Sequence, residues 1–134
     1  MGVVFEVRIA WGDCDEAGIV FYPNYFYWMD SAFQALLRKN GLSQRLLRER
    51  FNVVGTPIVD TGAKFLAPAS YDDLLHVHAA VDHWSARSFR VRYHGQRDEV
   101  AVFEGFEVRV FAARRENGGI RAAPIDPAFR EAMG

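Results

Sequence analysis

Apolar and polar residues alternate from Phe5 to Trp11, in a segment that starts at Val3. An alternation with a period of two predicts a half-buried β-strand. Two glycines and three acidic residues then fall within seven positions, Gly12 to Gly18. Glycine and acidic residues favour turns, so we expect a loop directly after this strand.

The pattern changes to a helical period between Asn24 and Asn40. Apolar residues three or four positions apart form one stripe, which predicts an amphipathic helix. The stripe consists of Tyr25, Trp28, Met29, Ala32, Phe33, Leu36 and Leu37. Asn24 is a candidate N-cap, and Asn40 with Gly41 tolerates the left-handed conformation that ends many helices. Additional aromatic residues near its start predict that the helix is covered by the rest of the chain or by a partner.

The rest of the chain predicts a short second helix and then a sheet. The helix is expected from Ser43 to Arg50, with Leu46 and Leu47 on its buried side. The predicted strands are Val53–Leu66, Leu74–Trp84, Phe89–Gln96, Val100–Ala113 and a short one after a turn at Glu116–Gly119, with a helical turn at Pro127–Met133. One sheet against one long helix is an α+β architecture, and 134 residues suit one domain, residues 1–134.

Charge and cysteine content narrow the function classes. Sixteen basic and seventeen acidic residues leave a net charge of −1, which argues against a nucleic-acid partner. A single cysteine, Cys14, excludes an intrachain disulfide and fits a reducing compartment. The uncharged run from Ala17 to Met29 is interrupted by Pro23 and is too short to span a membrane. The first residues lack a signal-peptide pattern, so we expect a cytoplasmic protein without a membrane partner.

The acidic loop ahead of the long helix carries the candidate chemistry. Asp13, Asp15 and Glu16 precede a helix N-terminus, where unpaired backbone N–H groups and a partial positive charge are expected. Such a helix start can stabilise an oxyanion while a carboxylate attacks or activates water. A solvated acidic turn without catalytic function is the alternative. Residue types alone leave all three acids as candidates.

Other chemistries fit the sequence less well. Counted from Asp13, the fifth and twelfth positions are Ala17 and Asn24, which does not match an EF-hand calcium loop. Cys14 is flanked by carboxylates that disfavour its thiolate, so a cysteine nucleophile would need a distant histidine and stays a minor alternative. The four histidines are His76, His78, His83 and His94. The first two share a strand face, where an outer polar surface is favoured over a metal site, so neither metal nor cofactor is predicted.

Two adjoining segments form a recognisable motif: Gly12 to Val20 (GDCDEAGIV) and Tyr22 to Tyr25 (YPNY). They resemble the signature of the 4-hydroxybenzoyl-CoA thioesterase family. The resemblance continues, in order along almost the whole chain, at residues 55–59 (GTPIV), 69–73 (ASYDD), 88–89 (SF) and 107–112 (EVRVFA). The first motif is fairly specific to the family, and the later ones support it through their order.

The resemblance implies a hotdog fold, in which a curled antiparallel sheet wraps one long helix. It implies dimers with continuous sheets, usually paired into tetramers, and active sites between subunits. Asp15 matches the family's catalytic aspartate, which acts as nucleophile or general base. The backbone N–H of Tyr22 matches the group that polarises the thioester carbonyl. Thr56 matches a residue that the partner subunit contributes, and Asp30 one near the distal end of the aromatic ring.

Two further groups are candidates for substrate binding. Trp28, among the aromatic residues at the helix start, suits a flat aryl group, although core packing explains it equally well. The family has a basic cluster for CoA phosphates after the residue that matches Trp84. This chain departs from that pattern and keeps only Arg87 there, which leaves Arg87 with Arg90 to meet the phosphates.

The expected function is hydrolysis of 4-hydroxybenzoyl-CoA or a related aroyl-CoA by a cofactor-free homotetramer. A broad short-chain acyl-CoA or acyl-carrier-protein thioesterase is the alternative within the same fold. A non-catalytic acyl-CoA-binding module is the alternative from another class.

Overall fold

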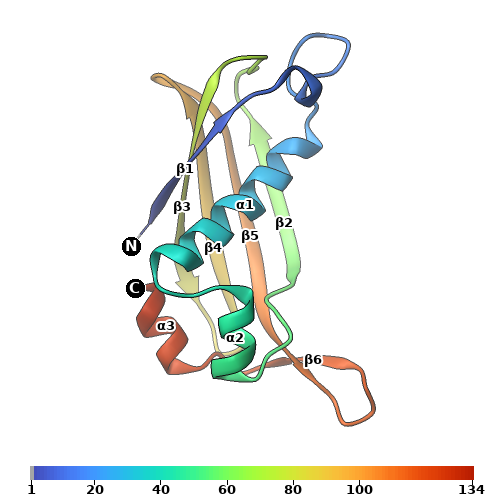
Figure 1. Cartoon of the computed structure of the whole chain (residues 1–134), viewed down its shortest axis with the longest axis vertical. Helices are drawn as coiled ribbons and strands as arrows, with labels where there is room; N and C mark the ends of the chain where they lie inside the picture. The colour runs from blue at the N-terminus through green and yellow to red at the C-terminus, as the bar shows by residue number, and fades with distance from the viewer. Residues whose placement is uncertain (1) are drawn as a thin grey trace.

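A curled antiparallel sheet is crossed by one long helix in the computed structural model, which describes residues 2–134 (Figure 1). The elements are β1 (Val3–Arg8), η1 (Trp11–Asp13), α1 (Pro23–Lys39), α2 (Gln44–Phe51), β2 (Ile58–Phe65), β3 (Leu74–Trp84), β4 (Ser88–Arg97), β5 (Val100–Arg114), β6 (Ile120–Ala123) and α3 (Pro127–Met133). The predicted α+β architecture is confirmed, as are the predicted bounds of β3 and α3.

The strand order places the two edges of the sheet. The strands follow the order β1-β3-β4-β5-β2, and β6 pairs with the last residues of β5. β1 and β2 are therefore edge strands, and most of β2 is exposed to solvent. β2 runs from the end of the molecule where α2 lies to the end that carries the loop before α1 (Figure 1).

The long helix lies against one face of the sheet and supplies much of the core. All seven residues of its predicted apolar stripe are buried. The helix comes very close to β5 at Gly105, where an added Cβ would lie 2.8 Å from Met29 Sδ. Glycine at this position therefore allows the close contact between helix and sheet. None of the helices within residues 2–134 is long and apolar enough to cross a membrane.

The start of α1 differs from the prediction. The helix begins at Pro23, and Asn24 is not its N-cap; Tyr22 occupies that position without a side-chain cap. Proline suits the first helical position because its fixed φ is helical and the first turn has no acceptor for its missing N–H. The other end is as expected, because Gly41 has a left-handed φ of 76°.

Two other predicted boundaries and one predicted buried residue need correction. β1 ends at Arg8, because the next residues turn into η1. The strand predicted from Val53 starts only at Ile58, after a segment that connects α2 to the sheet. Both leucines of α2 were predicted to be buried. Leu47 is fully buried, whereas Leu46 lies on the exposed side of the helix.

Candidate active site

The loop between β1 and α1 is held by hydrogen bonds to both of its ends. Asp13 Oδ2 accepts a bond from the backbone N–H of Ala10 at 2.8 Å. The backbone oxygen of Asp13 accepts two more, from Phe21 N at 2.9 Å and from Asn24 Nδ2 at 2.8 Å. Asp13 thus fixes the loop's shape, and its carboxylate is engaged in doing so.

Asp15 lies in a tight exposed turn. Its Oδ1 accepts a hydrogen bond from Ala17 N at 2.9 Å, and its backbone bonds to Gly18 and Ile19 close the turn. Gly18 has a φ of 80°, a conformation that glycine adopts without strain. Among the described residues, no donor reaches Asp15 Oδ2. This oxygen is therefore free to attack a substrate or to activate water.

The backbone N–H of Tyr22 is the free donor at the start of α1. Phe21 N–H donates to Asp13, Asn24 N–H donates to Phe21 O, and Pro23 has no N–H. Tyr22 N–H has no acceptor within residues 2–134. The helix dipole adds partial positive charge here, so the group suits a developing oxyanion.

Asp15 and Tyr22 line the same pocket, which has a volume of about 470 Å³. Its remaining walls are apolar or aromatic and come from Ile19, Val20, Tyr25, Phe65, Leu66, Ala67 and Pro68. The Phe65 ring is 49% exposed and stands edge-on to Tyr22, with 6.2 Å between ring centroids. The pocket therefore brings Asp15 and Tyr22, each of which has an unpaired polar group within the described residues, beside surface that suits an apolar group.

The structure separates the three acidic candidates. Asp13 is engaged by Ala10, and Glu16 is exposed outside the pocket lining. Asp15 alone among them lines the pocket. The geometry thus supplies the reason for choosing Asp15 that residue types did not give.

Of two aromatic residues of α1, Tyr25 lines this pocket and Trp28 does not. Trp28 is only 5% exposed and packs edge-on against Tyr25 at 5.6 Å, so its side chain lies in the core. Burial, together with the nearby Cys14, raises the pKa of Tyr25 to about 12. The Tyr25 phenol therefore stays protonated at neutral pH and contributes an uncharged wall.

The alternative chemistries receive little support from the geometry. Cys14 Sγ points to the backbone oxygen of Ala10, at 3.8 Å, and makes no hydrogen bond to a histidine of the described chain. His78 and His94 lie side by side on neighbouring strands, with 6.2 Å between their rings. Within residues 2–134, no three His, Cys, Asp or Glu side chains gather as a possible metal site.

Asp30 and Thr56 form a second cluster at the other end of β2. Arg109 joins them: its Nη2 donates to Asp30 Oδ1 and its Nη1 to Thr56 O, each at 2.8 Å. Thr56 lies two residues before the start of β2, whereas the Asp15 pocket lies at the strand's end. Eight residues of strand span about 26 Å at 3.3 Å per residue. Of the four predicted site residues, one chain therefore places Asp15 with Tyr22 and Asp30 near Thr56, but does not bring all four together.

The two arginines predicted for phosphate binding differ in availability. Arg90 is held by Asp82, with Nε at 2.8 Å from Oδ1 and Nη2 at 3.3 Å from Oδ2. Burial raises the pKa of Asp82, but bonds from Arg90 and Arg92 outweigh this and lower it overall. Arg87 is exposed in the turn between β3 and β4 and forms no ion pair in the described part of the chain.

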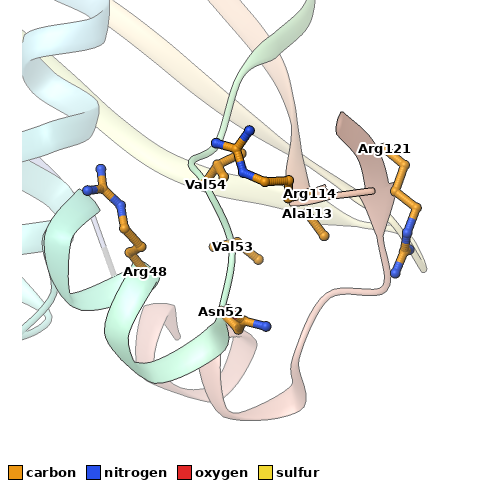
Figure 2. A pocket seen from close by; sticks show the side chains of 7 residues that line it. All are labelled: Arg48, Asn52, Val53, Val54, Ala113, Arg114 and Arg121. Atoms are coloured by element: carbon orange, nitrogen blue, oxygen red, sulfur yellow. The ribbon is translucent and has the colours of Figure 1, made fainter. Parts of the chain in front are cut away.

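A further group of arginines was not predicted from the sequence. Arg48 of α2, Arg114 at the end of β5 and Arg121 of β6 surround a pocket of about 570 Å³ (Figure 2). None of the residues that line it is acidic. No local pattern in the sequence indicated this group, because the three positions are far apart along the chain.

Comparison with known proteins fits this geometry. A family model described as the thioesterase-like superfamily matches residues 9–133. A 4-hydroxybenzoyl-CoA thioesterase from Pseudomonas sp. (strain CBS-3) is 39% identical over 131 residues, covering 92% of this chain and 90% of the relative. The chain belongs to the thioesterase-like superfamily.

Solved structures place this thioesterase-like chain among hotdog-fold proteins, as the resemblance implied. A mutant 4-hydroxybenzoyl CoA thioesterase complexed with 4-hydroxybenzoyl CoA has a TM-score of 0.92 and 34% identity, covering 99% of each chain. A gentisyl-coenzyme A thioesterase has a TM-score of 0.84 and 31% identity, covering 98% of this chain and all of that one. Both the family and the fold predicted from the sequence are therefore confirmed.

Proposed function

We propose that this thioesterase-like protein hydrolyses an aroyl-CoA, such as 4-hydroxybenzoyl-CoA, to the free acid and CoA. The observation that carries the proposal is the pairing of Asp15 and Tyr22 in one pocket. A carboxylate with a free oxygen and a free N–H at a helix start are the two groups that thioester hydrolysis requires.

The reaction follows from these two groups. The thioester carbonyl accepts a hydrogen bond from Tyr22 N–H, which stabilises the negative charge that forms on the oxygen. Asp15 either attacks the carbonyl carbon, forming an anhydride that water then opens, or deprotonates the attacking water. Both routes consume one water, break the C–S bond and release CoA as its thiol. A thiolate leaves readily, so the proposal needs neither a metal nor a cofactor.

The aromatic acyl group is supported by the pocket and by the relatives. Phe65 and Tyr22 offer exposed ring surface beside Asp15, which favours a flat apolar group. The similar proteins named above are thioesterases of 4-hydroxybenzoyl-CoA and gentisyl-coenzyme A, both of which carry hydroxylated aromatic acyl groups. A cytoplasmic location, where Cys14 would stay reduced, is part of the same proposal.

The proposal includes a site shared between subunits. The outer edge of β2 has no strand partner within the described chain, and Val59 on it is 62% exposed. Antiparallel pairing of β2 with its copy would continue the sheet and set the start of one strand beside the end of the other. Thr56 of the second copy would then lie near Phe65 and the Asp15 pocket. This supports the expected dimer, and pairing of two dimers would give the tetramer.

The arginine pocket is the best-supported place for the phosphates of CoA. Arg48, Arg114 and Arg121 have no acidic neighbour in the pocket, whereas Asp82 already neutralises Arg90. Val54 lines both the arginine pocket and the pocket beside Thr56. The arginine pocket is therefore a neighbour of the pocket beside Thr56. Arg87 is the second candidate, because it is exposed and unpaired within the described residues.

A thioester screen tests the proposal. Purified protein is assayed for thiol release with 4-hydroxybenzoyl-CoA, benzoyl-CoA, short-chain acyl-CoA esters and an acyl-carrier-protein thioester. We expect the highest kcat/KM with the hydroxylated aroyl-CoA. Higher kcat/KM with aliphatic or carrier-protein thioesters would favour the broad thioesterase. Tight CoA binding without turnover of any thioester would favour the binding module.

A further inference from the structure

The loop between β2 and β3, residues 66–73, lies at the same end of the molecule as the turn from Asp15 to Ile19 (Figure 1). We call the latter the Asp15 turn. Ser70 of the loop forms an isolated antiparallel bridge with Ile19. Its hydroxyl donates a hydrogen bond to the backbone oxygen of Gly18. Ser70 therefore contacts the second half of the Asp15 turn through both its backbone and its side chain.

Gly18 is the conformationally most permissive residue of the Asp15 turn. Its φ is 80°, and glycine adopts left- and right-handed conformations at similar cost. An added Cβ at Gly18 would meet nothing within 4 Å, so side-chain packing does not restrain this residue. The Ser70 hydroxyl bonds the Gly18 carbonyl group and therefore favours one orientation of this peptide.

The orientation of the Gly18 peptide is coupled directly to Asp15. Gly18 N donates to Asp15 O, and Asp15 N donates to Ile19 O, each at 2.9 Å. These two bonds flank the peptide between Gly18 and Ile19, whose carbonyl oxygen Ser70 binds. A change in that peptide would therefore move the Asp15 backbone and the carboxylate that it carries.

The loop that carries Ser70 is itself anchored to the sheet. Ile9, directly after β1, donates its backbone N–H to Asp73 O at 2.9 Å. At the other end of the loop, Leu66 N donates to Val102 O of β5 at 2.8 Å. Within the loop, Asp73 Oδ2 accepts a bond from Ser70 N at 2.9 Å. Ser70 is thus held by a framework that joins β1 to β5.

We propose that Ser70 is a positioning residue for Asp15: its hydroxyl holds the Gly18 carbonyl and thereby keeps the free Asp15 oxygen directed at the thioester carbon or at the attacking water. The proposal rests on the proposed function, because Asp15 is the group that Ser70 places. Ser70 does not line the Asp15 pocket, so it acts through the turn. A reacting group displaced by about 1 Å can cost a large part of the rate, so one hydrogen bond to the turn matters for kcat.

The test separates the hydroxyl from the rest of the Ser70 side chain. Ser70→Ala removes the bond to Gly18 and keeps the backbone contacts, whereas Ser70→Thr retains a hydroxyl. We expect kcat for the aroyl-CoA to fall about tenfold in Ser70→Ala with little change in KM, because the placement of Asp15 is impaired rather than substrate binding. Ser70→Thr should keep a kcat near that of the unmodified protein.

Ser31→Ala is the matched control. Ser31 Oγ donates to Tyr27 O at 3.0 Å within α1, so this variant loses a bond of the same kind away from the Asp15 turn. Its kcat should not change. A loss in Ser31→Ala as large as that in Ser70→Ala would overturn the proposal. An unchanged kcat in Ser70→Ala, or a Ser70→Thr variant as slow as Ser70→Ala, would overturn it too.

A second background tests whether Ser70 acts through Asp15. In Asp15→Asn the carboxylate is already absent, so adding Ser70→Ala should not lower the residual kcat further. A further loss of about tenfold in the double variant would show that Ser70 supports the fold rather than Asp15, and would contradict the proposal. If the unmodified protein hydrolyses no thioester, the proposed function fails, which is a different result from any of these.

Discussion

Asn24 Nδ2 donates a hydrogen bond to the backbone oxygen of Asp13 at 2.8 Å, which ties the start of α1 to the loop that carries Asp15. Phe21 N donates to the same oxygen at 2.9 Å. Tyr22 lies between these two donors in sequence. The contact therefore fixes the position of the Tyr22 N–H relative to the Asp15 turn.

Removal of this contact should impair catalysis more than stability. In Asn24→Ala the loop loses one of its two bonds to the helix start, and the Asp15 carboxylate becomes less well placed. We expect kcat for the aroyl-CoA to fall about tenfold and the free energy of unfolding to fall by about 1 kcal/mol. Steady-state kinetics and denaturant unfolding measure the two effects. An unchanged kcat would show that the Asp13–Asn24 bond does not position the site.

Asp15→Asn should abolish most of the activity. The amide keeps the shape of the side chain but removes the charge that attacks the thioester or activates water. We expect kcat to fall by about 10²–10⁴-fold with a smaller change in KM. Glu16→Gln is the matched control, because Glu16 lies outside the pocket, and its kcat should stay near that of the unmodified protein. Comparable losses in the two variants would contradict the assignment.

The proposed subunit interface can be tested with two valines on opposite edges of the sheet. Val59 on β2 is 62% exposed, and Val4 on β1 is 48% exposed. Val59→Arg should dissociate the oligomer and lower kcat, because β2 pairing completes the site. Val4→Arg introduces the same charge on the other edge and should leave both the oligomer and kcat unchanged. Sedimentation velocity and thiol-release assays would separate these outcomes, and an intact oligomer in Val59→Arg would rule out β2 as the interface.

Local patterns in the sequence predicted the local elements well. The apolar stripe from Tyr25 to Leu37 gave α1 because helical spacing is a property of neighbouring residues. The N-cap was wrong because Asn24 uses its side chain for Asp13, a contact that no pattern indicates. The arginine pocket combines residues of α2, β5 and β6, which only the folded chain brings together.

The candidate site follows the same division: a sequence motif indicates its residues, whereas the contacts between them depend on the fold. The motif indicated Asp15 as the candidate, but its advantage over Asp13 depends on the hydrogen bond from Ala10 to Asp13, which only the structure shows. The motif also indicated Asp30 and Thr56, whereas the link through Arg109 depends on long-range packing.

The arginine pocket predicts an effect that depends on the phosphates of CoA. Arg114→Gln removes one of the pocket's three positive charges and should raise KM for an aroyl-CoA about tenfold, on the scale of one charge-assisted bond. For the corresponding N-acetylcysteamine thioester, which lacks phosphates, KM should not change. Arg90→Gln is the control, because Arg90 is already paired with Asp82. Equal KM increases with both thioesters in Arg114→Gln would show that the pocket does not bind phosphate.

Tyr25 predicts a loss of stability at high pH. Burial, aided by the Cys14 charge, raises its pKa from 10.0 to about 12 in the folded protein. Between these values the unfolded chain has lost the phenolic proton and the folded chain retains it, so the free energy of unfolding falls as pH rises. The contribution is fully present below pH 10.0 and is lost as the pH rises through about 12. Tyr25→Phe removes this titration, and denaturant unfolding across that range should show a smaller decline than in the unmodified protein. Identical declines in the two proteins would contradict the raised pKa of Tyr25, because the other tyrosines are common to both.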